Sequence, residues 1–151
     1  MDKYEVLKQY FGYDAFRDGQ EKMIDAITSG RDVLGIMPTG AGKSLCYQIP
    51  ALMAGENGGI TLVISPLISL MKDQVSALNQ AGVHAAYLNS SLTSGQYYKA
   101  LGYAREGRYP IIYVAPERLL TPEFLDFAVY AKIAMVAVDE AHCVSQWGNR
   151  A

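Results

Sequence analysis

Met37-Pro38-Thr39-Gly40-Ala41-Gly42-Lys43-Ser44 follows directly on the apolar run Asp32-Val33-Leu34-Gly35-Ile36. An apolar strand that turns through glycines into a lysine and a serine is typical of sites that hold a nucleotide triphosphate. Backbone N–H groups close around the phosphates, Lys43 supplies positive charge, and the Ser44 hydroxyl can bind magnesium. The full pattern has a glycine where this chain has Met37, and an ordinary strand–helix turn is the competing interpretation.

Apolar, β-branched-rich runs alternate with helical patterns along the chain. Strands are predicted at residues 32–37, 60–65, 84–88, 110–114 and 133–138. Helices are predicted at residues 2–11, 17–29, 43–53, 67–81, 94–106 and 117–131, with a kink or a restart at Pro50. Strands that are apolar on both faces indicate a parallel sheet covered by helices on both sides. We therefore predict an α/β fold with three layers, α/β/α, and a mostly parallel sheet that binds ligands at the carboxyl ends of its strands.

The composition indicates one domain without an obvious partner. The chain has 151 residues, and thirteen basic against fifteen acidic side chains give a net charge of −2, so bulk charge does not indicate nucleic acid. Cys46 and Cys143 lack metal-site spacing and are interpreted as reduced and buried, with a disulfide or zinc site as the alternative. No apolar run approaches the ~20 residues that cross a bilayer. We expect a soluble cytoplasmic protein, nucleoid-associated if bacterial, with no membrane partner.

Two adjacent acids, Asp139 and Glu140, follow the last predicted strand. Burying one unpaired ion costs several kcal/mol, and a magnesium ion on nucleotide phosphates removes that cost with Asp139 as its partner. Glu140 can then orient or deprotonate the attacking water. A helix N-cap is the alternative interpretation, and the presence of Lys43 and Ser44 favours the catalytic one.

A second candidate set lies near the start of the chain. Arg17 and Gln20 are expected to share one face of a helix. A glutamine can pair with the N6/N7 edge of adenine, and Tyr13 and Arg17 could stack on the base. The alternative is a tyrosine–arginine packing contact beside a solvated glutamine.

Six segments in order resemble the RecQ family of DNA helicases, from about Leu7 to Gly148. They are Phe11 to Gln20, Met37 to Ser44, Ser44 to Leu52, Ser65 to Gln74, Tyr113 to Leu119 and Asp139 to Gly148. The resemblance also explains Met37, because this family commonly lacks the first glycine of the phosphate loop.

The resemblance implies a RecA-like phosphate-loop fold and ATP-driven 3′-to-5′ translocation on single-stranded DNA with duplex unwinding. It implies that Tyr13, Arg17 and Gln20 read adenine, and that His142 couples the nucleotide site to the rest of the motor. It further implies that phosphates and Mg²⁺ are held by Thr39, Gly40, Ala41, Gly42, Lys43 and Ser44, with Asp139 and Glu140 as the metal and water acids.

Candidate contacts with DNA come from the same segments. Ser65 and Pro66 are expected to open a helix, with serine as cap and proline at the first position, and Pro116 repeats the arrangement. Capping alone would explain both. The remaining candidates, each with a simpler interpretation as a solvated lysine, a Glu117–Arg118 pair, a turn or a core tryptophan, are Lys72, Arg118, Asn89, Gln146 and Trp147.

Family members continue with a second RecA-like lobe, an arginine finger, and zinc-binding and winged-helix domains. Residues 1–151 are therefore expected to be the N-terminal portion of the first lobe, incomplete at its C-terminus, with weak ATP binding and negligible hydrolysis. A missing central strand predicts altered strand pairing, self-association or excision from a longer protein, whose full-length form would be a monomer. A small kinase, a non-catalytic nucleotide- or DNA-binding module, and an RNA-directed helicase are the alternative functions.

Overall fold

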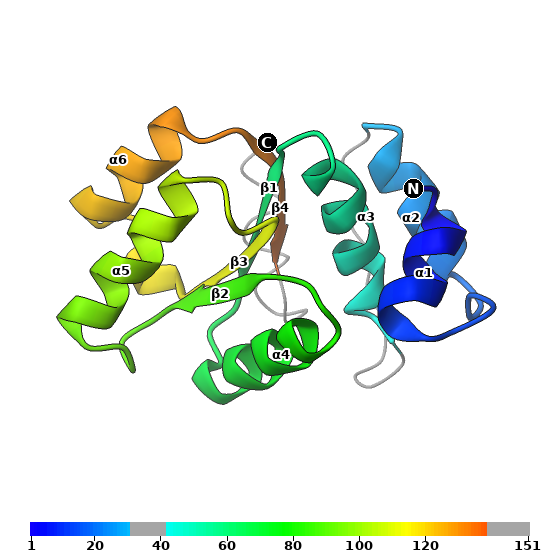
Figure 1. Ribbon diagram of the computed structural model, residues 1–151, viewed down its shortest axis with the longest axis horizontal. Coiled ribbons are helices and arrows are strands. Elements are labelled where there is room, and N and C mark those ends of the chain that lie inside the picture. Colours follow the sequence, from blue (N-terminus) through cyan, green and yellow to red (C-terminus); the bar gives the residue numbers. More distant parts are fainter. Residues whose placement is uncertain (31–41, 139–151) are drawn as a thin grey trace.

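The computed structural model describes residues 1–30 and 42–138, which fold as a parallel sheet between layers of helices (Figure 1). The helices are α1 (Lys3–Phe11), α2 (Gln20–Thr28), α3 (Leu45–Gly55), α4 (Ile68–Gln80), α5 (Ser94–Arg105), the 3₁₀ helix η1 (Pro116–Arg118) and α6 (Pro122–Tyr130). The strands are β1 (Ile60–Ile64), β2 (Ala85–Leu88), β3 (Ile111–Val114) and β4 (Ile133–Val138). The predicted strand at 32–37 lies outside the described residues.

The four described strands have the order β2-β3-β1-β4, and the pairs between them are all parallel. Helices α1 to α4 pack on one face around a core that includes Val63 and Tyr113, and α5 and α6 pack on the other around Leu62 and Ile112. The three central side chains Val63, Ile112 and Tyr113 are fully buried. The predicted three-layer α/β/α architecture with a parallel sheet is confirmed.

Strand β4 differs from the prediction that every strand is apolar on both faces and covered. Val136 is 48% exposed and Ala134 is also exposed, whereas β1 is buried along its whole length. Val136 pairs in register with Leu62 of β1, so the two side chains lie on the same face of the sheet. Helices α5 and α6 cover this face over the neighbouring strands. These two helices cover β2, β3 and β1 and contact only the start of β4, at Ile133. Among the described strands, β4 lies at the edge of the sheet beside β1. The predicted altered pairing and self-association stay predictions.

The predicted helix over 117–131 is wrong in its first part, where the structure has η1 and then a new helix, α6. Pro122 has no N–H and disfavours helical backbone in the residue before it, and Thr121 has the extended angles φ −72 and ψ 144. The Thr121 hydroxyl donates to the Arg118 carbonyl at 2.7 Å, which closes the preceding turn. The chain therefore restarts its helix at Pro122, with proline in the first turn.

Two further expectations about helix starts need correction. Ser65 does not cap α4, because that helix begins at Ile68 with Leu67 as its N-cap residue. The Ser65 hydroxyl instead accepts the Leu67 N–H at 3.3 Å, and a tight turn places Pro66 before the helix rather than at its first position. Helix α3 runs without a restart through Pro50.

Within residues 1–30 and 42–138, none of the helices combines the length and the apolar character that crossing a membrane requires. Cys46 is buried, as expected, and burial raises the pKa of its thiol. Cys143 lies outside the described residues.

Candidate nucleotide-binding site

Helix α3 runs antiparallel to the strands, so its start lies at their carboxyl ends. Near its start, the Gln48 side-chain N–H donates to the Tyr113 hydroxyl near the end of β3, at 3.0 Å. At its other end, a methyl group on Gly55 would stand 2.7 Å from the Cβ atom of Pro110, which precedes β3. Gly42, Lys43 and Ser44, the phosphate-loop residues that the structure describes, therefore lie at the sheet edge where parallel α/β folds bind ligands.

Gln20, one of the predicted adenine-reading residues, lies against the phosphate loop. Its side chain is 2% exposed, and its Nε2 donates to the Gly42 carbonyl at 3.0 Å. Its Oε1 accepts the Arg17 backbone N–H at 2.7 Å. The alternative of a solvated glutamine is therefore wrong. An amide group has two N–H donors and two acceptor lone pairs, so one of each is left for a bound base.

Arg17 does not share a helix face with Gln20, and that expectation is wrong. Helix α2 begins only at Gln20, because Gly19 before it has a left-handed backbone with φ 84. Arg17 lies in the loop before α2, and its side chain nevertheless comes close to Gln20 and Gly42. Its Nη1 lies 3.9 Å from the position that a Cβ atom on Gly42 would take, so a guanidinium, a buried amide and the phosphate loop are brought together.

Two observations favour glycine at position 42. Its φ of +76 lies in the left-handed region, which costs residues with a Cβ atom about 1–2 kcal/mol. A Cβ atom there would also stand 2.5 Å from the Gln20 Nε2, closer than real contacts allow. The glycine thus allows the loop to turn and the glutamine to approach.

Lys43 and Ser44 lead into α3 at its positive end. Ser44 is the N-cap residue, yet its side chain makes no capping hydrogen bond. Its hydroxyl is therefore available as the magnesium ligand that the sequence predicts. The helix N-terminus adds a partial positive charge that favours phosphate at this position.

An ionic cluster fixes α1 against α2 and so supports the start of α2. The Lys3 ammonium lies 2.8 Å from the Glu21 carboxylate and 2.5 Å from that of Asp25, and the Tyr4 hydroxyl donates to Glu21. Hydrogen bonds from Lys3 and then Tyr4 lower the pKa of Glu21.

Tyr13, the third residue predicted to read adenine, follows the left-handed cap Gly12. Its side chain is 51% exposed, as that of a residue that stacks on a base would be.

Several predicted site residues lie outside the described residues and are not placed. They are Thr39, Gly40, Ala41, Asp139, Glu140, His142, Gln146 and Trp147. Val138, the last described residue before the acids, pairs in register with Ile64 at the carboxyl ends of two neighbouring strands.

Arg118, a predicted DNA contact, stacks on Tyr97 rather than pairing with Glu117. Its guanidinium lies 4.6 Å from the Tyr97 ring centre. Among the described residues, the Arg118 Nε and the Tyr97 hydroxyl are both buried without a hydrogen-bond partner. Both residues line a cavity of about 110 Å³ together with Ser94 and Glu123. Sequence reasoning did not identify Tyr97.

The other described DNA-contact candidates differ in accessibility. Lys72 is exposed on α4 and Pro116 is half-buried at the start of η1, whereas Ser65 and Asn89 are fully buried. The Asn89 Oδ1 accepts the backbone N–H and the hydroxyl of Ser91, at 2.9 and 2.6 Å. This geometry supports the turn interpretation of Asn89.

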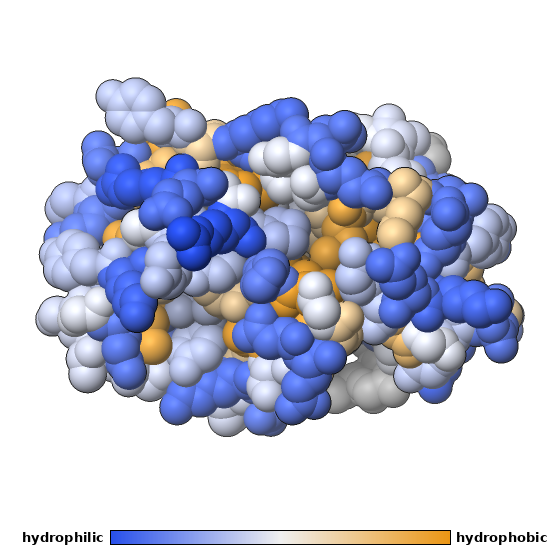
Figure 2. Space-filling view, viewed as in Figure 1, coloured by the Kyte–Doolittle hydropathy of each residue, from blue (hydrophilic) through white to orange (hydrophobic). Residues whose placement is uncertain are grey.

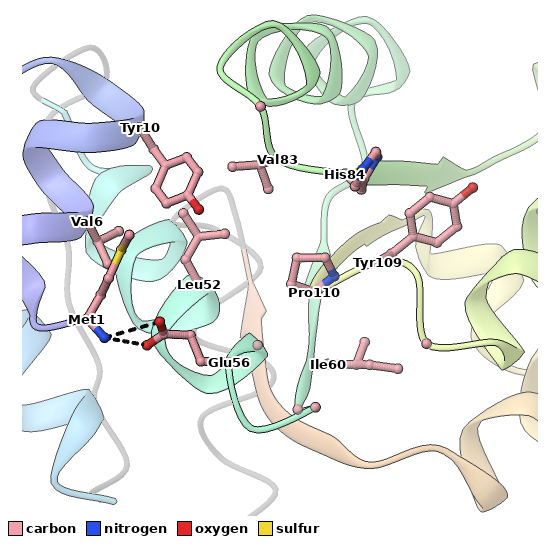
Figure 3. A pocket seen from close by; sticks show the side chains of 15 residues that line it. Met1, Val6, Tyr10, Leu52, Glu56, Ile60, Val83, His84, Tyr109 and Pro110 are labelled. Atoms are coloured by element: carbon pink, nitrogen blue, oxygen red, sulfur yellow. Dashed lines mark hydrogen bonds and ion pairs between the residues drawn. The ribbon is translucent and has the colours of Figure 1, made fainter.

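A larger cavity, of about 250 Å³, lies away from the described residues of the candidate nucleotide site (Figure 3). It lies at the amino ends of the strands, and Tyr10, Leu52 and Val83 are among the side chains that line it. The terminal ammonium of Met1 pairs with Glu56 at its rim, at 2.8 Å. Apolar residues gather near the middle of the face in Figure 2, between hydrophilic regions. None of the predicted site residues within 1–30 and 42–138 lines this cavity.

Comparisons with known proteins identify the family of the chain. A family model described as DEAD/DEAH box helicase matches residues 17–151. The ATP-dependent DNA helicase RecQ of Bacillus subtilis is 52% identical over 95% of this chain, and that of Haemophilus influenzae is 51% identical over 95%. This chain covers only 24% and 23% of those two proteins.

A solved structure has the same fold. It is a hypothetical ATP-dependent RNA helicase from Sulfolobus tokodaii, with a TM-score of 0.68 and 25% identity, and the match covers 97% of this chain and 43% of that one. The RecA-like fold that the family resemblance implied is thereby confirmed. The chain belongs to the DEAD/DEAH box helicase family, and over nearly its whole length about half of its residues are identical to those of RecQ DNA helicases.

Proposed function

We propose that this chain is the N-terminal portion of the first motor lobe of a RecQ-type DNA helicase. The whole protein would couple ATP hydrolysis to 3′-to-5′ movement on single-stranded DNA and to duplex unwinding, in DNA repair or recombination. Identity of 51–52% to two bacterial RecQ helicases supports this assignment. The second lobe and the zinc-binding and winged-helix domains would belong to the rest of that protein.

The observation that carries the proposal is the contact between Gln20 and the phosphate loop. One buried amide is fixed by Arg17 on one side and by Gly42 on the other, which leaves its remaining donor and acceptor for one base. The N6 amine and N7 atom of adenine match that pair, and guanine does not. Arg17 and the exposed Tyr13 would stack on the base.

The phosphates would lie over the start of α3, where Lys43 neutralises charge. Mg²⁺ would be held by Ser44, whose hydroxyl is not used in capping, and by Asp139. The ion would neutralise charge on the β- and γ-phosphates. Glu140 would orient the attacking water, and His142 would link this site to the rest of the motor.

DNA would lie along the same edge of the sheet. Lys72 and Arg118 lie on the elements that follow β1 and β3, and Gln146 and Trp147 follow the acid motif in sequence. An RNA-directed helicase is the second candidate function, since the solved neighbour is described as an RNA helicase. The much higher identity to DNA helicases favours DNA.

The test compares nucleotide binding by the chain and by Lys43→Ala, followed by binding of fluorescent single-stranded DNA and RNA of equal length. We expect the wild-type chain to bind Mg-ATP, the variant to lose that binding, and DNA to bind more tightly than RNA. Binding of ATP that is unchanged in Lys43→Ala would refute the nucleotide site. A preference for RNA would support the second candidate.

A further inference from the structure

Four polar side chains form a hydrogen-bonded cluster between α3, α4 and β3. The Gln48 Nε2 donates to the Gln74 Oε1 at 2.8 Å and to the Tyr113 hydroxyl at 3.0 Å. The Tyr113 hydroxyl donates to the same Gln74 oxygen at 3.3 Å, and the Tyr47 hydroxyl lies 3.1 Å from that of Tyr113. Tyr113 is fully buried, and Gln48 and Tyr47 are 5% and 8% exposed.

Each of the three elements leads to a different part of the proposed motor site. Gln48 lies one helical turn after Ser44, and its backbone N–H donates to the Ser44 carbonyl at 2.9 Å. Gln74 lies on α4, the helix that carries Lys72. Tyr113 lies on β3, which leads into η1 and Arg118. The cluster therefore joins the helix that would hold phosphates to two elements that would contact DNA.

The chemistry of the cluster makes this junction specific. Gln74 acts in it only as an acceptor, since its Oε1 receives both hydrogen bonds. Buried polar groups that lose their partners are costly, whereas a fully paired network fixes one arrangement of its elements. A shift of α3 relative to α4 would break the bonds to Gln74, so a displacement at one element is transmitted to the others.

We infer that Gln48, Gln74 and Tyr113 are positioning residues that couple nucleotide binding to binding of single-stranded DNA. The inference rests on the proposed function. Coupled sites typically change each other's affinity by roughly 5- to 150-fold, and the effect is reciprocal. Side chains that connect two sites alter such coupling by roughly two- to thirtyfold.

The test measures the affinity of the chain for fluorescent single-stranded DNA with and without Mg²⁺ and a non-hydrolysable ATP analogue. The ratio of the two affinities is the coupling factor, and a purely structural role would not change it in a folded variant. Gln74→Met removes the acceptor at similar volume. Gln74→Glu keeps an acceptor oxygen in the same place. Gln80→Met, an exposed position on the same helix, is the matched control.

We expect the coupling factor to fall in Gln74→Met, to be retained in Gln74→Glu and to be unchanged in Gln80→Met, with thermal unfolding confirming that all three fold. If Gln74→Met does not fold, Tyr113→Phe, which loses the central hydroxyl, takes its place. The coupling factor is then expected to fall in Tyr113→Phe and to be retained in Gln74→Glu. Unchanged coupling in the folded acceptor-deficient variant, or no coupling in a wild-type chain that binds both ligands, would overturn the inference and leave the proposed function standing. A wild-type chain that binds neither ligand would refute both.

Discussion

Replacing Gln20 by glutamate tests whether a buried amide donor holds the phosphate loop. The substitution keeps the shape of the side chain and the oxygen that accepts the Arg17 N–H, but the ionised form cannot donate to the Gly42 carbonyl 3.0 Å away. Because the site is 2% exposed, the carboxyl would face a carbonyl oxygen without water around it. The introduced group therefore has an ionised form that is unfavourable in the folded chain.

The expected loss follows from these contacts. Leaving a buried polar group without its partner costs about 1–3 kcal/mol. For a chain of this size each kcal/mol lowers the melting temperature by about 2–4 °C, so we expect a decrease of about 2–12 °C near pH 8. The affinity for Mg-ATP should fall in the same variant, since Gly42 belongs to the phosphate loop.

The pH dependence provides the sharper assay. Burial and the facing carbonyl raise the folded-state pKa of the introduced carboxyl above its unfolded value of about 4.3, against the opposing effect of the nearby Arg17 guanidinium. Its protonated form can donate to Gly42, so the variant should approach wild-type stability as the pH falls toward about 5 and lose stability as it rises. Melting of the wild type, Gln20→Glu and the exposed control Gln9→Glu is followed across this range. A decrease in melting temperature that does not depend on pH, or an equal decrease in the Gln9→Glu control, would refute the reasoning.

Three further perturbations have defined outcomes. Gly42→Ala should lower the free energy of unfolding by about 1–2 kcal/mol from its left-handed backbone alone, and should also weaken Mg-ATP binding; urea titration shows whether the stability is instead unchanged. Tyr97→Phe removes a buried hydroxyl that lacks a partner among the described residues, so stability should stay within about 1 kcal/mol of wild type or rise, and a larger loss in urea would contradict that. Hydrogen bonds from Lys3 and Tyr4 lower the pKa of Glu21. Its contribution to the stability of the fold is therefore present above the ordinary pKa of 4.5, and it is lost as the pH falls through the lower pKa of the folded state. Glu21→Gln should therefore lose less stability on acidification than the wild type does. An equal loss in both would show that the ionic cluster of Lys3, Tyr4 and Glu21 does not cause the loss.

Much of the fold could be predicted from the sequence because the strands are short apolar runs between clear turn residues. The prediction for 133–138 matches β4 residue for residue, and Gly12 ends α1 as expected. The errors lie where a local backbone feature overrides periodicity. Gly19 delays the start of α2, and Pro122 divides the predicted helix over 117–131. Both residues are visible in the sequence, but their effect depends on the backbone angles that tertiary packing selects.

The candidate site was predictable in its residue types but not in its contacts. The sequence pattern indicated Gln20 and Gly42 separately, and only the fold shows that one donates to the other. The cluster of Gln48, Gln74 and Tyr113 was missed, although a glutamine within the apolar run of α3 is a recognisable signal of a buried polar partner. Its partners lie 26 and 65 residues away in sequence, which no local pattern reveals.

The central claim is that Gln20 and the phosphate loop form one site for adenine nucleotides. The most direct measurement is competition of ATP and GTP for the chain in the presence of Mg²⁺, for the wild type and Gln20→Met. The account predicts that ATP binds roughly 5- to 150-fold more tightly than GTP, as a bidentate base contact provides, and that Gln20→Met loses this preference. Equal binding of the two nucleotides by the wild type, or an unchanged preference in the variant, would contradict it.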